Sequence, residues 1–455
     1  MATAEVVVLG MGPGGEHVAT ELAQAGLDVV GVEKELLGGE CPYWACVPTK
    51  MMVRASDALA EGRRVNELAG HARVDASWEP VARRIREDAT DNWHDDAAVR
   101  RFESTGGRFI RGPGRLDGAK RVVVGDEAIE VSRAIVVATG TRPRVPPIDG
   151  LDGVDYWTNR GAVAATEIPK SLVVVGAGAV GCEFSQMFAR FGSRVTLLEG
   201  EAHVLPNEEV EACQLLHEIF GADSIDVRAE QAAVACAADG DGVVVTLGSG
   251  ATVSAARMLV ATGRRADLEA IATSTIGVDE NKSWIPVDDH LRVDGAPGVW
   301  AIGDVVGGGF THMSVHHARI AVADILGRPG PGTSDRAKPR VTFTDPEVGA
   351  VGLTERQARD RGMDVRVGVA QVPSSARGWI HKAGNEGFIK LVEDGERGVL
   401  VGATSVGPDG GEVLSMLTLA IHGEVPCEHL RHMIYAYPTF HRTIEDALRD
   451  LAAGG

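Results

Sequence analysis

The chain has few basic residues relative to acidic ones, and this shortage excludes several classes of protein. It holds 45 lysines and arginines against 64 aspartates and glutamates, a formal net charge of −19. Nucleic acid and anionic membranes repel such a protein, so neither is expected as a partner. The sequence also lacks an apolar run of about 18 residues and a basic leader segment, so we expect a cytoplasmic protein that does not enter a membrane.

Cysteine and aromatic residues are scarce as well. Six cysteines in 455 residues are too few for a disulfide scaffold, so a close pair among them is expected to be catalytic or metal-binding. Aromatic residues make up 5%, with only four tyrosines. Glycine, by contrast, supplies 57 positions, well above the usual ~7%, which indicates many tight backbone turns. At roughly 100–200 residues per domain, the length predicts two to four domains.

A glycine-rich turn follows the first apolar stretch. The sequence predicts a strand over 5–10, a turn, a helix to Ala25 and a second strand that ends at Glu33. The turn carries a G-x-G-x-x-G pattern, whose glycines permit the turn and close approach of a pyrophosphate. The glycines of this segment are Gly10, Gly12, Gly14 and Gly15. Glu33 is placed to accept hydrogen bonds from ribose hydroxyls, so a dinucleotide site is predicted here.

The same unit returns over residues 172–199, with the same spacing of 23 positions from first glycine to final acid. Its turn residues are Gly176, Gly178, Val180 and Gly181, and its acid is Glu199. One such pattern is weak evidence, but two copies in full context predict two bound dinucleotides. An acid at position 199 repels a 2′-phosphate, and no arginine follows in GEAHVLP, so NADH is favoured over NADPH.

Cys41 and Cys46 lie five positions apart, soon after the first unit. An ideal helix would hold them too far apart for a disulfide, so the segment must bend. Pro42 disfavours helical backbone at Cys41, which keeps that residue off a helix expected to begin near Cys46. Such a helix start would favour the thiolate at Cys46. Half a zinc site and two unrelated thiols are the alternatives; no second cysteine or histidine pair completes a zinc set, so we expect no metal.

Taken together, these motifs resemble the class I pyridine nucleotide-disulfide oxidoreductases, which include dihydrolipoamide dehydrogenase, glutathione reductase and mercuric reductase. Four further segments carry the resemblance: AIVVATGTRPRVP at 134–146, MLVATGRR at 258–265, GVWAIGDVVGG at 298–308 and PRVTFTDPEVGAVGLTERQA at 339–358. By this resemblance Asp304 bonds the ribityl chain of FAD. Further cofactor contacts are implied at Thr139, Gly140, Gly263 and Gly303.

The resemblance implies an α/β fold, with two Rossmann-like domains for FAD and NAD and a C-terminal α+β dimerisation domain. The FAD domain would span 1–146 and 266–335, the NAD domain 147–265 and the interface domain 336–455. A homodimer is expected.

The family mechanism implies that electrons pass from NADH to FAD, then to a Cys41–Cys46 disulfide and on to a small-molecule acceptor. Cys46 would contact the flavin and Cys41 would meet the substrate. Lys50 and Glu183 match a charged pair near the flavin N5; alternatively, they are an ordinary helix lysine and a surface acid.

The chain departs from the family in its last segment, IYAYPTFHRTIEDAL. Tyr437 stands where the disulfide-reducing members have a catalytic histidine, and Arg442 stands where they have its partner glutamate. A tyrosine, with a pKa near ~10, is a poor proton shuttle at neutral pH. This puts ordinary dihydrolipoamide or glutathione turnover in doubt.

Three hypotheses follow. In the first, Tyr437 donates a hydrogen bond to a quinone or another aromatic acceptor, with Tyr43 and Trp44 as an aromatic wall; Tyr435 also falls in the segments expected to converge there. In the second, the chain is similar to mercuric reductase, although it lacks that enzyme's C-terminal cysteine pair. In the third, His441 replaces the base, one helical turn from Tyr437. A non-enzymatic redox sensor or flavin store is a weaker alternative, because it would not need the cysteine pair.

Overall fold

The computed structural model describes residues 2–453, which divide into two compact units. The first unit comprises the N-terminal strand through Thr49, then Arg83–Arg144 and Gly263–Ser334. The second comprises Lys50–Ala82, Val145–Thr262 and the residues from Asp335 onward. The chain therefore passes between the units several times.

The first unit is built on a seven-stranded sheet in the order β3-β2-β1-β6-β5-β4, with β16 also paired to β6. Strands β1, β2, β3, β6 and β16 run parallel, whereas β5 pairs antiparallel with both of its neighbours, β6 and β4. Its strands are β1 (Ala2–Leu9), β2 (Val29–Glu33), β3 (Arg108–Arg111), β4 (Gly114–Leu116), β5 (Arg121–Val124), β6 (Glu127–Val137) and β16 (Val299–Ala301), with a small β7 (Arg142–Pro143) and β15 (Arg264–Arg265) pair beside them. Its helices are α1 (Pro13–Gln24), α2 (Glu40–Tyr43), α5 (Asp96–Glu103) and α9 (Thr311–Ile325).

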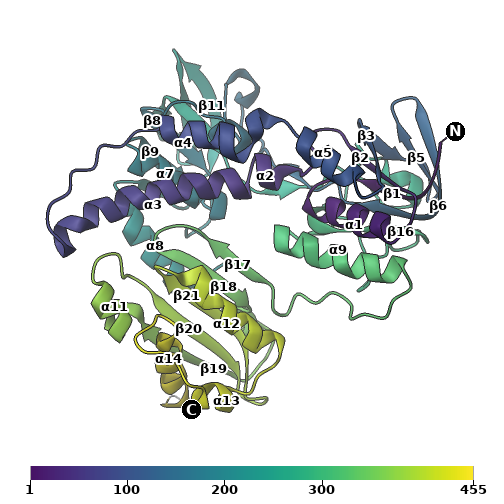
Figure 1. The fold of residues 1–455 in the computed structure, drawn as a ribbon. Helices are drawn as coiled ribbons and strands as arrows, with labels where there is room; N and C mark the ends of the chain where they lie inside the picture. Colours follow the sequence, from purple (N-terminus) through teal and green to yellow (C-terminus); the bar gives the residue numbers. More distant parts are fainter. Residues whose placement is uncertain (1, 454–455) are drawn as a thin grey trace. The chain divides into compact units, whose positions relative to one another are not determined.

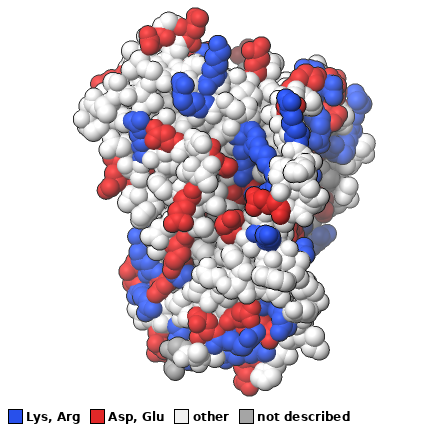
Figure 2. Space-filling model, turned by 90° about the vertical axis from the view of Figure 1, so that its left-hand side faces the viewer, with Lys and Arg blue, Asp and Glu red and all other residues white. Residues whose placement is uncertain are grey.

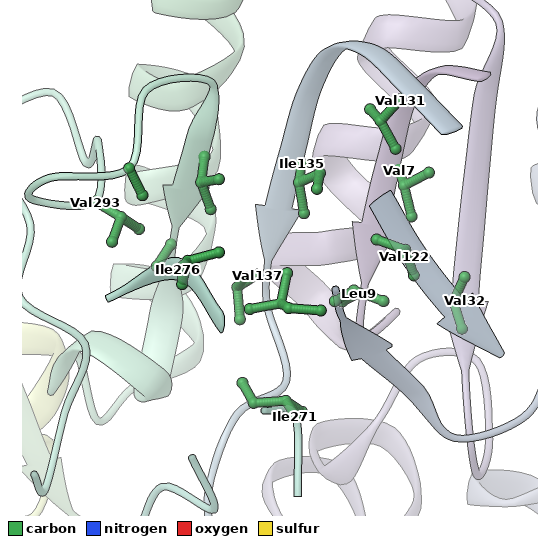
Figure 3. Packing of buried hydrophobic residues seen from close by; sticks show 14 of the residues in the cluster. Val7, Leu9, Val32, Val122, Val131, Ile135, Val137, Ile271, Ile276 and Val293 are labelled. Carbon is green, nitrogen blue, oxygen red and sulfur yellow. The ribbon is translucent and has the colours of Figure 1, made fainter. Parts of the chain in front are cut away.

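The central strands of this sheet are apolar on both faces because both faces are covered. Along β1, Val7 and Leu9 face one core, whereas Val6 and Val8 face the other. Figure 3 shows the first core, to which Val7, Leu9, Val32 and Val137 contribute together with residues of the 271–293 segment. The second core lies under α1 and α9, which run side by side on the opposite face (Figure 1).

The second unit contains three further sheets, two of which lie between residues 171 and 260. A parallel sheet has the order β10-β9-β8-β14, and β11, β12 and β13 form an antiparallel sheet. These elements are β8 (Ser171–Val175), β9 (Arg194–Leu198), β10 (Asp226–Arg228), β11 (Ala233–Asp239), β12 (Gly242–Leu247), β13 (Thr252–Ala255) and β14 (Arg257–Val260), with α6 (Asn159–Val163), α7 (Ala179–Arg190) and α8 (Val210–Ala222). The long helix α3 (Cys46–Leu68) begins in the first unit and continues into the second, and α4 (Glu79–Arg84) also crosses the boundary.

The C-terminal part of this unit is an antiparallel sheet covered by helices. The sheet order is β17-β18-β21-β20-β19, and α12 packs on β18 and β21 while α14 packs on β19 (Figure 1). The elements are β17 (Pro339–Thr342), β18 (Glu347–Gly352), α10 (Glu355–Asp360), β19 (Val365–Gln371), α11 (Ala376–His381), β20 (Phe388–Asp394), β21 (Val399–Gly407), α12 (Gly410–His422), α13 (Cys427–His432) and α14 (Arg442–Ala453). The predicted fold class, with α/β nucleotide-binding folds and an α+β C-terminal region, is confirmed.

Several of the few aromatic side chains pack against one another at the C-terminal end of α7 in the second unit. Trp78 donates its indole N–H to the carbonyl of Ala165 at 2.8 Å and meets Phe191 edge to face at 5.0 Å. Trp157 lies 5.9 Å from Phe188. Such contacts add to the burial of apolar surface, so part of the small aromatic content stabilises this core.

Charges of both signs are present on the surface despite the acidic net charge. On the face that Figure 2 shows, basic and acidic side chains lie intermixed. None of the described helices is long and apolar enough to span a membrane.

Glu347 in β18 lies in an acidic neighbourhood. Its Oε2 accepts a hydrogen bond from the Gly411 N–H at 2.8 Å, and the carboxylates of Asp409, Asp57 and Glu412 face it. Burial, and then these charges, raise the pKa of Glu347 from its ordinary 4.5 to about 7. In the folded state, Glu347 is therefore mostly protonated below about pH 7.

Replacing Glu347 with glutamine should stabilise the protein at high pH and leave it unchanged at low pH. The stability that Glu347 contributes is present below about pH 4.5 and is lost as the pH rises through about 7. Such a pKa change corresponds to roughly 3 kcal/mol, which solvent screening reduces to about 1–2 kcal/mol. The free energy of unfolding at pH 5 and pH 8.5 measures this, with the exposed Glu428→Gln as control. An equal effect of Glu347→Gln at both pH values would contradict the assignment.

Candidate active site

The first glycine turn joins β1 to α1. Gly10 has φ +91°, a conformation that side chains disfavour, and a Cβ on Gly15 would overlap the carbonyl oxygen of Gly10. Gly12 is the N-cap of α1, and a Cβ there would meet nothing within 4 Å. Glu33, at the end of β2, accepts the Met11 N–H at 2.9 Å. Gly10 and Gly15 thus shape the turn, whereas open space lies at Gly12.

The second turn, between β8 and α7, repeats this geometry residue by residue. Gly176 has φ +100°, and a Cβ on Gly181 would overlap the carbonyl oxygen of Gly176. Gly178 is the N-cap of α7 and has open space at its Cβ position. Glu199 accepts the Ala177 N–H at 2.7 Å, as Glu33 does in the first turn.

Both turns fit the pyrophosphate of a dinucleotide. A glycine N-cap offers no side-chain acceptor to the first N–H groups of the helix, and the helix dipole there favours an anion. Each carboxylate oxygen can accept a further hydrogen bond, so Glu33 and Glu199 can hold the loop and also meet ribose hydroxyls. Val180, in the first turn of α7, is 45% exposed beside the open space at Gly178.

The remaining predicted cofactor residues also lie at turns. Thr139 and Gly140 follow β6, and Gly140 has φ +66°. Gly263 follows β14 and has φ +99°. Gly303 has φ +75° and donates its N–H to Nδ1 of the buried His317 at 3.2 Å.

Asp304 lies in the short helix that begins at Gly303. Its Oδ2 accepts the Thr141 hydroxyl at 3.2 Å, and Arg264 donates to the same hydroxyl at 2.8 Å. The first unit therefore brings Asp304 together with the segment after β6. Gly14 packs near Ser314, since a Cβ on Gly14 would lie 2.6 Å from its hydroxyl, so this glycine serves the contact of α1 with α9.

The two cysteines lie on either side of a bend. Cys46 is the first residue of α3, as predicted. Cys41 is off α3, as predicted. The accompanying expectation that Pro42 disfavours helical backbone at Cys41 is wrong, since Cys41 belongs to the separate four-residue helix α2 and proline is tolerated in a first helical turn. The bend comes at Trp44, with φ −135° and ψ −5°, and separates α2 from α3.

The bend places Cys41 in hydrogen-bonding contact with Cys46, and both side chains are partly accessible thiols. This hydrogen bond, followed by burial, raises the pKa of Cys41. Cys41 therefore holds its proton more tightly than an ordinary thiol does. The Thr311 hydroxyl, at the start of α9, lies 3.2 Å from Cys46 Sγ. Sequence reasoning missed Thr311, since nothing in the motifs links position 311 to position 46.

Thr311→Val should make the reduced cysteine pair less reactive. Valine keeps the shape of threonine but removes the hydroxyl that can stabilise a negative charge on Cys46. Because alkylation requires a thiolate, its rate at pH 7.5 should fall about tenfold. Alkylation by iodoacetamide followed by peptide mass spectrometry measures this rate, with Thr311→Ser as the variant that restores it. An unchanged rate in the valine variant would show that the hydroxyl has no effect on the pair.

Lys50 and Glu183 form an ion pair. Lys50 Nζ lies 2.5 Å from Glu183 Oε2, and the glutamate is only 9% exposed on α7. Glu183 Oε1 accepts the Phe343 N–H at 2.8 Å, and Lys50 Nζ lies 4.6 Å from the Phe343 ring centre. The alternative of a surface acid is therefore wrong for Glu183, whereas the Lys50 side chain, 34% exposed, is ion-paired but still partly solvated. Phe343 was missed by sequence reasoning, although it lies within the motif at 339–358.

The geometry proposed for Tyr437 and His441 is wrong. These residues were expected one helical turn apart, but α14 begins only at Arg442, and Tyr437 precedes Pro438, where helical backbone is disfavoured. Both side chains are exposed, Tyr437 by 69%. The Arg442 guanidinium lies 5.4 Å from the Tyr437 ring centre and pairs with Glu445 at 3.0 Å.

The aromatic wall is also not formed as expected. Tyr43 is buried by the chain itself, with 7% exposed, so it presents no surface to a substrate. Trp44 stacks on Trp93 at 5.2 Å. Tyr435 is buried and donates its hydroxyl to the Leu430 carbonyl at 3.1 Å, and burial raises its pKa to about 12. The predicted convergence of three tyrosines on a substrate is therefore wrong for Tyr43 and Tyr435.

Comparisons with known proteins show the family of this chain. The family model "Pyridine nucleotide-disulphide oxidoreductase" matches residues 4–324, and the dimerisation domain of the same family matches residues 338–448. A dihydrolipoyl dehydrogenase from Chlorobaculum tepidum is 32% identical over 458 residues, which cover 98% of this chain and 96% of that protein. Another, from Bacillus subtilis, is 29% identical and covers 97% of both chains.

Two solved structures are similar to this chain over nearly its whole length. The HOCl-induced flavoprotein disulfide reductase RclA from Escherichia coli is 26% identical, with a TM-score of 0.84 over 99% of both chains. LpdA from Mycobacterium tuberculosis is 25% identical, with a TM-score of 0.87 over 99% of this chain and 100% of that one.

The chain belongs to the pyridine nucleotide-disulphide oxidoreductase family. It is an FAD-dependent NAD(P)H oxidoreductase of that class, and its dimerisation domain supports a homodimer.

Proposed function

We propose that the chain transfers two electrons from NADH, by way of FAD and a Cys41–Cys46 disulfide, to a small-molecule acceptor. The observation that carries this proposal is the cysteine pair: two partly accessible thiols in mutual hydrogen-bonding contact across a bend, with Cys46 at the first residue of α3 beside Thr311. A structural pair would need neither accessibility nor an adjacent hydroxyl.

Bound FAD supplies a two-electron carrier between NADH and the disulfide. The two cysteines of the chain carry the electrons from there to the acceptor. Two electrons and two protons break the Cys41–Cys46 bond and give two thiols; the acceptor then takes two electrons and two protons, and the disulfide forms again. Cys41 is the proposed interchange thiol and Cys46 the flavin-facing one. The ion pair of Lys50 with Glu183 is proposed to lie near the flavin.

The cofactor sites are proposed from the two glycine turns. The turn at Gly12 would hold FAD, with Asp304 at its ribityl chain, and the turn at Gly178 would hold NADH. NADH preference is supported by Glu199, and also by Arg228 on the neighbouring β10, whose guanidinium is already paired with Asp226 at 2.8 Å. The ratio of kcat/KM for NADH and NADPH tests this preference, which should reverse or vanish in Glu199→Ala if the carboxylate causes it.

The domain boundaries are proposed as predicted: an FAD domain at 1–146 and 266–335, an NAD domain at 147–265 and an interface domain at 336–455. The family model for dimerisation, over 338–448, is consistent with the last of these.

The acceptor is proposed to be a quinone or another flat aromatic compound. Tyr437 and Arg442 occupy the positions of the usual histidine and glutamate, so the chain lacks the ordinary acid–base pair for disulfide substrates. An exposed tyrosine hydroxyl can donate a hydrogen bond to a quinone oxygen without changing its own charge. The geometry gives His441 no support as a substitute base.

A second candidate function is dihydrolipoamide or low-molecular-weight disulfide turnover. The observation in its favour is the similarity over nearly the whole chain to proteins named dihydrolipoyl dehydrogenase.

A steady-state acceptor panel separates these functions. Lipoamide, small disulfides, Hg(II) and quinones are each tested with NADH, in wild type and in Cys41→Ser. We expect quinone turnover that depends on Cys41. Efficient lipoamide turnover would favour the second candidate, Hg(II) turnover would favour a mercuric reductase, and quinone turnover unaffected by Cys41→Ser would show that the disulfide is bypassed.

A further inference from the structure

A short segment far from the cysteines in sequence contacts the loop that carries them. Residues 91–95, called the clamp segment here, lie in the first unit, as do both cysteines. Trp93 donates its indole N–H to the carbonyl of Tyr43 at 3.3 Å and stacks on Trp44 at 5.2 Å, with the rings 22° from parallel. Both contacts fall at the bend between Cys41 and Cys46.

The clamp segment also holds the other side of Cys41. Asp95 is 6% exposed, and its Oδ2 accepts the Leu37 N–H at 2.6 Å and the Arg111 guanidinium at 2.6 Å. Leu37 precedes Cys41 by four residues, and Tyr43 follows it by two. Asp95 and Trp93 therefore fix the loop on both sides of the proposed interchange thiol.

The backbone of the clamp segment is strained. Asp91, Asn92 and Trp93 have φ of 47°, 54° and 58°, three consecutive left-handed residues without a glycine among them. Asparagine and aspartate tolerate this conformation, but a bulky tryptophan rarely adopts it. Strain of this kind persists where the surroundings impose it, and such outliers cluster at functional sites. Here the strained turn directs the Trp93 ring onto Trp44.

We propose that Trp93 is a positioning residue for the redox pair: by holding the bend at Tyr43 and Trp44, it keeps Cys41 next to Cys46 and so sets the equilibrium between disulfide and dithiol. This inference rests on the proposed function, because it takes the two cysteines as the redox couple. A loop free to move holds the two sulfur atoms together less of the time, so the disulfide becomes easier to reduce.

The test is the thiol–disulfide equilibrium of the FAD-loaded enzyme in dithiothreitol buffers of defined poise, read by alkylation and mass spectrometry. Trp93→Gly suits the left-handed backbone while removing the ring, and Trp93→Phe keeps a stacking ring without the N–H. The disulfide-to-dithiol ratio should fall about tenfold in the glycine variant and less in the phenylalanine variant. Reduction of FAD by NADH, followed by stopped flow, should keep its wild-type rate.

Trp300→Phe is the matched control, because Trp300 in the same unit also donates its indole N–H, but to Asp324 at 2.9 Å, a residue outside the cysteine loop. An unchanged ratio in both Trp93 variants, or an equal change in Trp300→Phe, would overturn the inference. If wild type forms no Cys41–Cys46 disulfide at any poise, the proposed function itself fails. The two failures are therefore distinguishable.

Discussion

Replacing Cys46 with serine should reduce the turnover of the acceptor at least about 10³-fold while FAD stays bound. Serine cannot form the disulfide, so the electrons have no carrier beyond the flavin. The long-wavelength thiolate-to-flavin absorption that NADH induces in the wild type should also disappear, because the proposed flavin-facing sulfur is gone.

Cys41→Ser is the matched variant. It should lose turnover to a similar extent, since it too cannot form the disulfide, but it should keep the long-wavelength absorption because Cys46 remains. Steady-state rates and anaerobic spectra with NADH measure both effects. Absorption that persists in Cys46→Ser and vanishes in Cys41→Ser would reverse the roles assigned to the two sulfur atoms.

Gly12→Val and Gly178→Val should block different cofactors. Each glycine is the N-cap of its helix with φ near −70°, and each has open space at its Cβ position, so the fold can accept a side chain at both sites. A valine would instead occupy the space proposed for a pyrophosphate. We expect Gly12→Val to purify without FAD, and Gly178→Val to keep FAD while the KM for NADH rises about 100-fold, or more than 2 kcal/mol of binding.

Absorbance of the purified proteins and steady-state kinetics with NADH measure these effects, and circular dichroism confirms that both variants fold. A Gly178→Val variant that loses FAD and keeps NADH binding would show that the two turns hold the opposite cofactors. Unchanged FAD content and KM in both variants would show that neither turn approaches a phosphate.

The fold could be predicted from the sequence to a large extent, because the features that encode it are local. The two strand–turn–helix units need glycine at Gly10, Gly15, Gly176 and Gly181 for reasons of backbone geometry alone, and their apolar strands need only to be covered on both faces. The start of α3 at Cys46 was likewise predictable from local propensity.

The candidate site was less predictable, because its remaining parts depend on contacts between distant segments. Trp93 and Thr311 contact the cysteine loop although they lie 47 and 265 positions after Cys46 in the sequence. Neither belongs to a motif from which the contact could be predicted. Burial also overturned expectations based on residue type. Tyr43 has the chemistry of a substrate-facing aromatic residue, but the chain packs it inside.

The central claim is that Cys41 and Cys46 are the redox couple of this enzyme. Anaerobic titration with NADH, with samples alkylated at each point and the cysteines identified by mass spectrometry, tests it most directly. The claim predicts that the first equivalent of NADH converts a Cys41–Cys46 disulfide into two alkylated thiols while long-wavelength absorption develops. Bleaching of the flavin by that first equivalent, with the two cysteines unchanged, would contradict it.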